Sequence, residues 1–206
     1  MKLTLLFCCL FTMLHAEPRL TYSKYFKGSK PESVLITVEL SGVASYREGA
    51  EDDNPLHFQL AESEAREMFQ LAGKLEHFQH PLESGLKVAN MGKKTFRFED
   101  GSETHEASFN YSEDPDAKTL TDWFERISET EQEFIELDNT IHFDKLGVDR
   151  ALALIRITYD HKRLVAPQQF LPLLDRVIKN ESFMHMARGH AASLAEVFRV
   201  SRPAQP

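Results

Sequence analysis

Cysteine is almost absent from this sequence of 206 residues. The two that occur, Cys8 and Cys9, both lie in an apolar run within residues 1–16. If that segment is removed during export, the remaining chain has no thiol nucleophile, no thiolate metal ligand and no disulfide. An exported chain without disulfides favours a bacterial periplasmic or secreted protein over a eukaryotic secretory one.

Residues 1–16 have the order of features that is typical of a secretory signal. Lys2 gives a positive start, Leu3–Leu14 form the apolar run, and the small Ala16 precedes the polar Glu17. We therefore expect cleavage between Ala16 and Glu17. The run is shorter than the roughly 20 residues of a membrane-spanning helix, so we expect no stable membrane span in the mature chain. The alternative is a buried N-terminal strand or helix.

The sequence also lacks an excess of basic residues. Its 24 lysines and arginines face 32 acids, a net charge of −8, which argues against a nucleic-acid partner. The acids concentrate in residues 113–144, which hold eleven acids and two bases, whereas residues 145–206 hold ten bases and five acids. We expect the acidic stretch to pair with the basic one within the chain. The alternative is a basic protein partner bound to the acidic 113–144 helix.

Catalytic motifs are missing as well. The sequence contains no G-x-S-x-G, P-loop, H-E-x-x-H or G-x-G-x-x-G, so it assigns no catalytic residue, cofactor or metal. The candidate zinc ligands are His57, His77 and His80, with Glu83 as a further oxygen ligand. The run Glu51-Asp52-Asp53-Asn54 could offer oxygens to calcium but lacks the spacing of a known loop, and we interpret it as a solvated hairpin tip.

The first half of the chain alternates like a sheet. We expect strands at 33–40, 43–47 and 56–60, followed by a helix over 62–78 that ends before Pro81. Asp100-Gly101 predicts a two-residue hairpin turn between 94–99 and 102–111. In that register Phe96 lies opposite His105, and Lys94 lies opposite Ala107.

Helical spacing replaces the alternation after Pro115. An apolar seam recurs every three or four residues from Leu120 to Ile141 and continues over 148–159 after a break. We expect a third helix over 168–179 and a fourth over 183–199, capped by Ser182. The seam fits a helical hairpin packed on its own chain better than a coiled-coil dimer.

These patterns together predict an α+β fold, with a small antiparallel β-sheet, a covering helix and then a C-terminal helical bundle region. The expected division is a signal peptide at 1–16, a sheet-plus-helix domain at 17–112, a helical region at 113–200 and a tail at 201–206. The helical region is expected to pack on the first domain.

Several stretches resemble a group of signal-bearing bacterial proteins of unknown function: Pro81–Gly101, Phe109–Gln132, and His142–Arg150 leading into Val165–Arg176. The resemblance implies an exported protein but no activity and no site residues. From the missing motifs and the segregated charge, we expect an exported, non-catalytic binding or interaction protein whose ligand the sequence does not name. The alternative is an exported hydrolase or metal-dependent enzyme that uses His57, His77 and His80 with nearby acids.

Overall fold

The computed structural model describes residues 17–49 and 54–200 and confirms the α+β class. The expected signal peptide, the acidic Glu51–Asp53 and the tail lie outside the described residues. The elements in chain order are β1 (Arg19–Tyr25), β2 (Ser33–Glu39), β3 (Val43–Glu48), β4 (Leu56–Gln59), α1 (Glu62–Lys74), the short helix η1 (Glu76–Phe78), β5 (Lys93–Asp100), β6 (Glu103–Phe109), α2 (Pro115–Phe143), α3 (Val148–Asp160), the short helix η2 (Pro167–Phe170), α4 (Leu171–Lys179) and α5 (His185–Val200).

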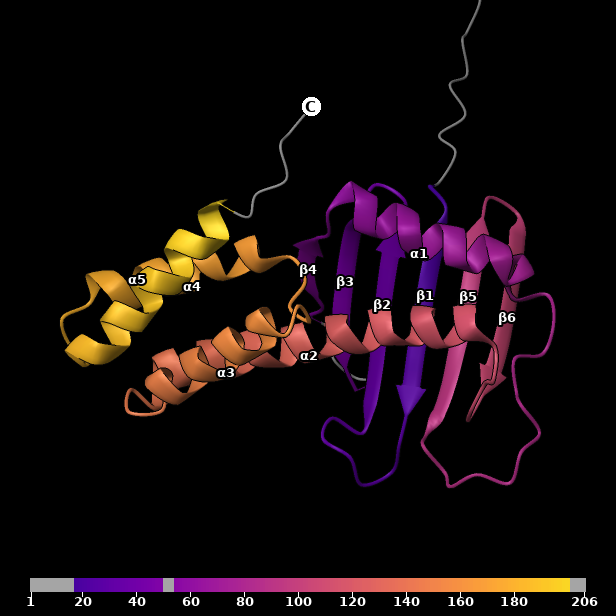
Figure 1. The fold of residues 1–206 in the computed structure, drawn as a ribbon, viewed down its shortest axis with the longest axis horizontal. Coiled ribbons are helices and arrows are strands. Elements are labelled where there is room, and N and C mark those ends of the chain that lie inside the picture. Colours follow the sequence, from indigo (N-terminus) through magenta and orange to yellow (C-terminus); the bar gives the residue numbers. More distant parts are fainter. Residues whose placement is uncertain (1–16, 50–53, 201–206) are drawn as a thin grey trace, which may run out of the picture.

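The six strands form one antiparallel sheet in the order β4-β3-β2-β1-β5-β6 (Figure 1). Sequence analysis missed β1, which lies inside the sheet between β2 and β5. Alternate residues of each strand point to one buried face, as expected for a sheet with one covered side. That face carries large apolar side chains, including Leu20, Tyr22, Ile36, Val38, Tyr46, Phe96 and Phe98.

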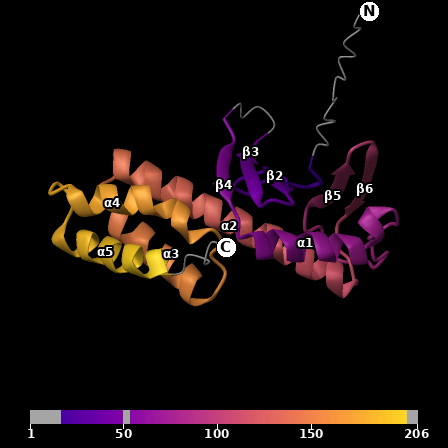
Figure 2. The same ribbon diagram turned by 90° about the horizontal axis from the view of Figure 1, so that it is seen from above.

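Two helices cover the same face of the sheet. α1 lies along one end of the strands, and the first half of α2 crosses the middle of the face (Figures 1 and 2). No helix of the described chain lies on the opposite face, which presents polar side chains such as Thr37 and Ser45, whose hydroxyls are 2.6 Å apart. On this face, the strand ends farthest from α1 extend beyond α2 and are not covered by a helix (Figure 1).

The predicted hairpin register is wrong by one pair. Phe96 lies opposite Ala107 and Lys94 opposite Phe109, so the turn residues are Gly101 and Ser102. The reason is the position of the positive φ, which Gly101 adopts at +57° as the first central residue of the turn. Each residue of β5 therefore lies opposite a residue of β6 two positions later than predicted, and because the shift is by two residues each side chain keeps its predicted face.

The predicted seam of α2 is buried within the chain. Asp114 caps the helix, since its Oδ1 accepts from the backbone N–H of Asp116 at 2.8 Å and of Ala117 at 3.0 Å. After a break at residues 144–147, α3 packs back along α2 and completes the predicted helical hairpin. The seam is therefore not a free surface for a coiled-coil partner.

Three predicted helix ends need correction. The first helix ends at Lys74, because positive φ angles in Glu76–Phe78 break it and form η1. The predicted 168–179 helix begins with η2, and α4 follows from Leu171. Ser182 does not cap the last helix, which begins at His185, because its hydroxyl accepts from Lys145 Nζ at 2.9 Å.

The predicted pairing of acidic and basic regions is confirmed. Arg163, which follows α3, contacts Glu129 at 2.7 Å and Asp122 at 3.0 Å on α2. Arg150 on α3 lies 3.6 Å from Glu136. Part of the acidic charge of α2 is thus neutralised within the chain.

Candidate functional site

The structure does not bring the three candidate histidines together. His57 is exposed on β4, at one edge of the sheet, whereas His77 and His80 lie at η1, which packs against β5 and β6 near the other edge. His77 stacks on Phe98 with ring centroids 4.1 Å apart, and His80 Nε2 lies 2.7 Å from Glu76 Oε2. These contacts give both rings structural partners.

Glu83, the further candidate ligand, is also engaged elsewhere. Its Oε2 accepts from the backbone N–H of Asn110 at 2.6 Å, and backbone N–H groups lower the pKa of its carboxyl group. Within residues 17–49 and 54–200, no three His, Asp or Glu side chains converge in a way that could hold a metal ion. The same residues include no helix that is long and apolar enough to cross a membrane.

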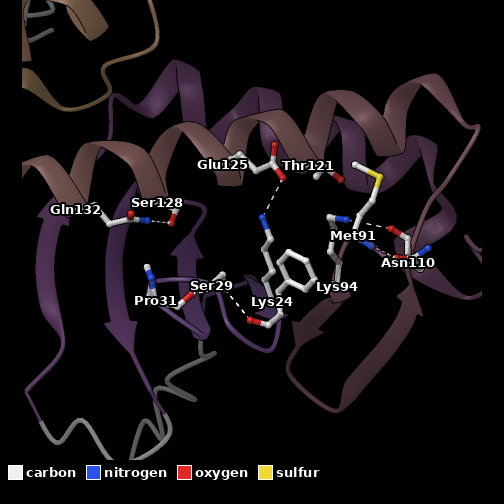
Figure 3. Close-up of polar contacts among 12 residues, drawn as sticks. Lys24, Ser29, Pro31, Met91, Lys94, Asn110, Thr121, Glu125, Ser128 and Gln132 are labelled. Carbon is white, nitrogen blue, oxygen red and sulfur yellow. Dashed lines mark hydrogen bonds and ion pairs between the residues drawn. The ribbon is translucent and has the colours of Figure 1, made fainter. Parts of the chain in front are cut away.

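A concavity lies where α2 crosses the sheet. A cleft of about 480 Å³ opens between β1, β2, α2 and α3, next to the uncovered strand ends. Figure 3 shows its centre, where Lys24 of β1 points toward Glu125 of α2 and Gln132 lies farther along the helix. We call this concavity the acidic cleft.

Four carboxylates of α2 line the acidic cleft, at intervals of three or four residues along one side of the helix. They are Glu125, Glu129, Glu133 and Glu136. Lys24 and Arg163 are the basic residues in its wall, so the wall has more negative than positive charge. Lys24 Nζ lies 3.5 Å from Glu125, and Arg163 is held by Glu129 and Asp122.

Glu133 has no basic partner among the described residues. Its Oε1 accepts from the hydroxyl of Thr158 at 2.5 Å, and its Oε2 is buried without a hydrogen-bond partner in the described part of the chain. Burial and the nearby Glu129 raise the pKa of Glu133. An added cation beside this carboxyl group would relieve both effects.

Tyr22 adds a second unsatisfied group to the wall. Its side chain is 1% exposed and its ring stacks on Phe124 of α2, with centroids 4.8 Å apart. The hydroxyl has no hydrogen-bond partner in residues 17–49 and 54–200. Burial and the charge of Glu125 raise the pKa of Tyr22, so the hydroxyl keeps its proton and can act as a donor.

A smaller pocket of about 210 Å³ continues past Glu125, which lines both concavities. Lys94 of β5 forms its wall and is directly opposite Lys24 in the sheet register. Figure 3 shows Lys94 beside Asn110, whose carbonyl oxygen accepts from Lys94 Nζ at 3.0 Å. Burial and the nearby Lys24 lower the pKa of Lys94.

The acidic cleft and the smaller pocket share Glu125, and we call them together the groove. The groove was not predicted from the sequence because its residues are far apart in the chain. The acids of α2 were recognised as a cluster, but their neighbours come from β1, which was not predicted. One signal was available: Lys94 alternates with Phe96 and Phe98, and therefore falls on the buried face of the predicted hairpin. A lysine is rarely buried in this way unless its ammonium group is paired.

Comparison with known proteins assigns no family. No protein-family model matches the sequence, and no curated protein matches it significantly. Any functional inference therefore rests on the groove itself.

Proposed function

We propose that this chain is an exported, non-catalytic binding protein, and that its acidic cleft holds a basic segment of a partner protein. The observation that carries the proposal is the unbalanced carboxylate row of α2, with Glu133 lacking any basic partner among the described residues. Burying a carboxylate without a cation beside it costs free energy. A ligand that places a cation there gains a charge-assisted contact, which favours its binding.

The spacing of the carboxylates favours an extended basic segment. Residues four apart on a helix are separated by about 6 Å along its axis. Alternate side chains of an extended peptide recur every 6.6–6.8 Å or so on one side. Lysines or arginines at every second position could therefore each meet one carboxylate, from Glu125 toward Glu136.

The ion pairs within the chain leave carboxylates of the acidic cleft available to a ligand. The Lys24–Glu125 contact is long at 3.5 Å, and Arg150 is a mostly exposed side chain 3.6 Å from Glu136. Exposed pairs of this kind contribute little stability, so a ligand can replace them at small cost. Arg163 is held more closely by two carboxylates, and we expect it to remain in place.

A binding titration with a synthetic peptide tests the proposal. The probe is a peptide of about seven residues with lysine and serine alternating and a free C-terminal carboxylate, measured by calorimetry against the mature chain. We expect binding that weakens as salt is added, and no binding of the matching glutamate–serine peptide.

Matched variants locate the site. Replacing Glu133→Gln and Glu136→Gln together keeps the shape of both side chains and should weaken binding about tenfold. The control pair, Glu181→Gln with Glu196→Gln, removes the same charge from exposed residues outside the cleft. Equal weakening by both pairs would mean that only the overall charge matters and would reject the cleft as the site.

Export is tested separately. The signal pattern leads us to propose that the exported protein begins at Glu17. N-terminal sequencing of the protein recovered from the periplasm or medium of a bacterial host checks this directly. A mature form that still begins at Met1 would contradict it.

A further inference from the structure

Lys94 is a buried cation near Glu125 and Glu83, and it forms an ion pair with neither of them. Its side chain is 6% exposed, yet no carboxylate of the described residues forms an ion pair with it. The carbonyl oxygen of Asn110 takes one of its three N–H donors. A buried ammonium group in this position is costly unless an anion or another acceptor approaches it.

In the ligand-free chain, the two acids that line the pocket, Asp122 and Glu125, each face a basic side chain. Asp122 pairs with Arg163 at 3.0 Å, and Glu125 faces Lys24 at 3.5 Å. The unpaired charge around the pocket is therefore positive: Lys94 in the wall, and Lys118, which lies over the ring of Tyr111 at 5.3 Å.

Ser112 supplies a further donor in the same wall. It is buried, and its Oγ accepts from the backbone N–H of Asp114 at 3.3 Å. The ammonium group of Lys94, two of whose donors are not taken by Asn110, and the nearby hydroxyl group of Ser112 suit a carboxylate, which accepts several hydrogen bonds.

We infer that the pocket at Lys94 binds the C-terminal carboxylate of the basic segment, so that the ligand is the basic end of a partner chain. This inference rests on the proposed function and adds the direction and the end group of the ligand. The two concavities share Glu125, so one ligand can occupy both. The carboxylate meets Lys94, and the basic side chains follow α2 toward Glu136.

The length of the groove sets the length of the ligand. From Glu125 to Glu136 the helix rises about 16 Å, which an extended peptide covers with about five residues. The basic residues that matter should therefore lie within about the last seven positions of the partner chain. A basic stretch in the interior of a chain would have no carboxylate for Lys94.

The test compares the alternating lysine–serine peptide in two forms, with a free C-terminal carboxylate and with a C-terminal amide. Both forms are titrated into the unmodified mature chain by calorimetry. We expect the free acid to bind at least about tenfold more tightly, since the amide replaces a charge-assisted contact with a neutral one. This comparison needs no substitution in the protein.

Two variants test whether the preference for the free-acid peptide over the amide arises at the Lys94 pocket. Lys94→Met keeps the apolar stem and removes the ammonium group, and should reduce the acid-over-amide ratio to about one. Lys93→Met is the matched control, because Lys93 is the exposed neighbour on the other face of β5. The control should keep the full ratio.

The outcomes separate the two proposals. If both peptide forms bind the unmodified chain equally, and Glu133→Gln with Glu136→Gln still weakens them, the carboxylate site is rejected and the acidic cleft stands. If neither form binds, the proposed function fails, and the assignment of Lys94 fails with it. A ratio that survives in Lys94→Met places the carboxylate elsewhere and overturns the inference.

Discussion

The two halves of the molecule share one helix but build their cores differently. The sheet core, which packs under α1 and the first half of α2, is rich in aromatic rings: Tyr22, Tyr46, Phe58, Phe78, Phe96, Phe98, Phe109, Trp123 and Phe124. The bundle core, formed by the second half of α2 with α3, α4 and α5, consists mainly of Leu, Ile, Val and Ala with three buried phenylalanines.

The two cores also differ in the sequence separation of the residues that form them. The bundle core uses residues 137–198, which are continuous in sequence. The sheet core begins at Leu20 and is completed by side chains of α2 and by Val165 and Ala166. The sheet therefore depends on helical residues from the other half, and the groove lies at this dependent junction.

The sharpest test of this asymmetry divides the chain at the predicted boundary. A fragment of residues 17–112 lacks Leu120, Phe124 and Ile127, which cover the sheet, and we expect it to be unfolded. A fragment of residues 113–200 keeps the whole bundle core and should remain helical. Circular dichroism and the dispersion of amide NMR signals measure both.

This experiment also tests the predicted division into a domain at residues 17–112 and a helical region at 113–200. A well-dispersed NMR spectrum from residues 17–112 would show that the sheet half folds without α2. That result would contradict the proposal that the sheet half needs α2 to fold whereas the bundle half does not.

A single ring of α2 probes the same dependence in the intact chain. Phe124 is 1% exposed and contacts Tyr22 and Phe96 of the sheet. Phe124→Ala should lower the free energy of unfolding by about 3–5 kcal/mol, measured by urea denaturation. Phe143→Ala on the same helix is the control, because that side chain is 86% exposed.

A loss below about 1 kcal/mol for Phe124→Ala would mean that the sheet core closes without this contact. A similar loss for Phe143→Ala would point instead to a general effect on α2. We expect the control to remain within about 0.5 kcal/mol of the parent protein.

The sequence predicts the locally determined parts of this fold. The seam of α2 and the faces of the hairpin follow from side-chain periodicity, which one segment contains in full. β1 escaped prediction because its buried face has only Leu20 and Tyr22 as apolar residues, with Lys24 at the third position. Its strand conformation depends on two neighbouring strands that are supplied from elsewhere in the chain.

The groove could be predicted only in part for the same reason. The acidic row of α2 is local and can be read from the sequence, where pairing within the chain is the expectation and a basic protein partner the alternative. The Lys24–Lys94 pair depends on the register of β1 with β5, and the orphan hydroxyl of Tyr22 depends on packing against α2. Neither arrangement leaves a pattern within one segment.

A buried acid between the halves gives a test that depends on pH. Glu131 of α2 is 0% exposed, accepts from Gln169 Nε2 at 2.8 Å, and has a pKa raised by burial to about 7. The folded state thus holds a proton that the unfolded state releases near pH 4.5. Stability should fall between about pH 4.5 and 7 and then level off, by roughly 3 kcal/mol in total.

Glu131→Gln removes this titration and keeps the shape of the side chain. We expect the variant to be more stable than the parent at pH 8 and nearly equal to it at pH 4, as measured by urea unfolding across this range. Glu196→Gln serves as the exposed control and should follow the parent at every pH. If Glu131→Gln shows the same decline between pH 4.5 and 7, other groups must cause it.

The smallest expected effect concerns the ion pairs that join the loop after α3 to α2. Arg163 contacts both Asp122 and Glu129, whereas Arg150 has one longer contact with Glu136. Arg163→Met should cost about 1 kcal/mol at low salt, and Arg150→Met less than about 0.5 kcal/mol, because exposed pairs contribute little. At 1 M salt the Debye length is about 3 Å, so the difference between the two variants should shrink. A cost for Arg163→Met that is unchanged by salt would show that the packing of its stem, rather than its charge, holds the loop to α2.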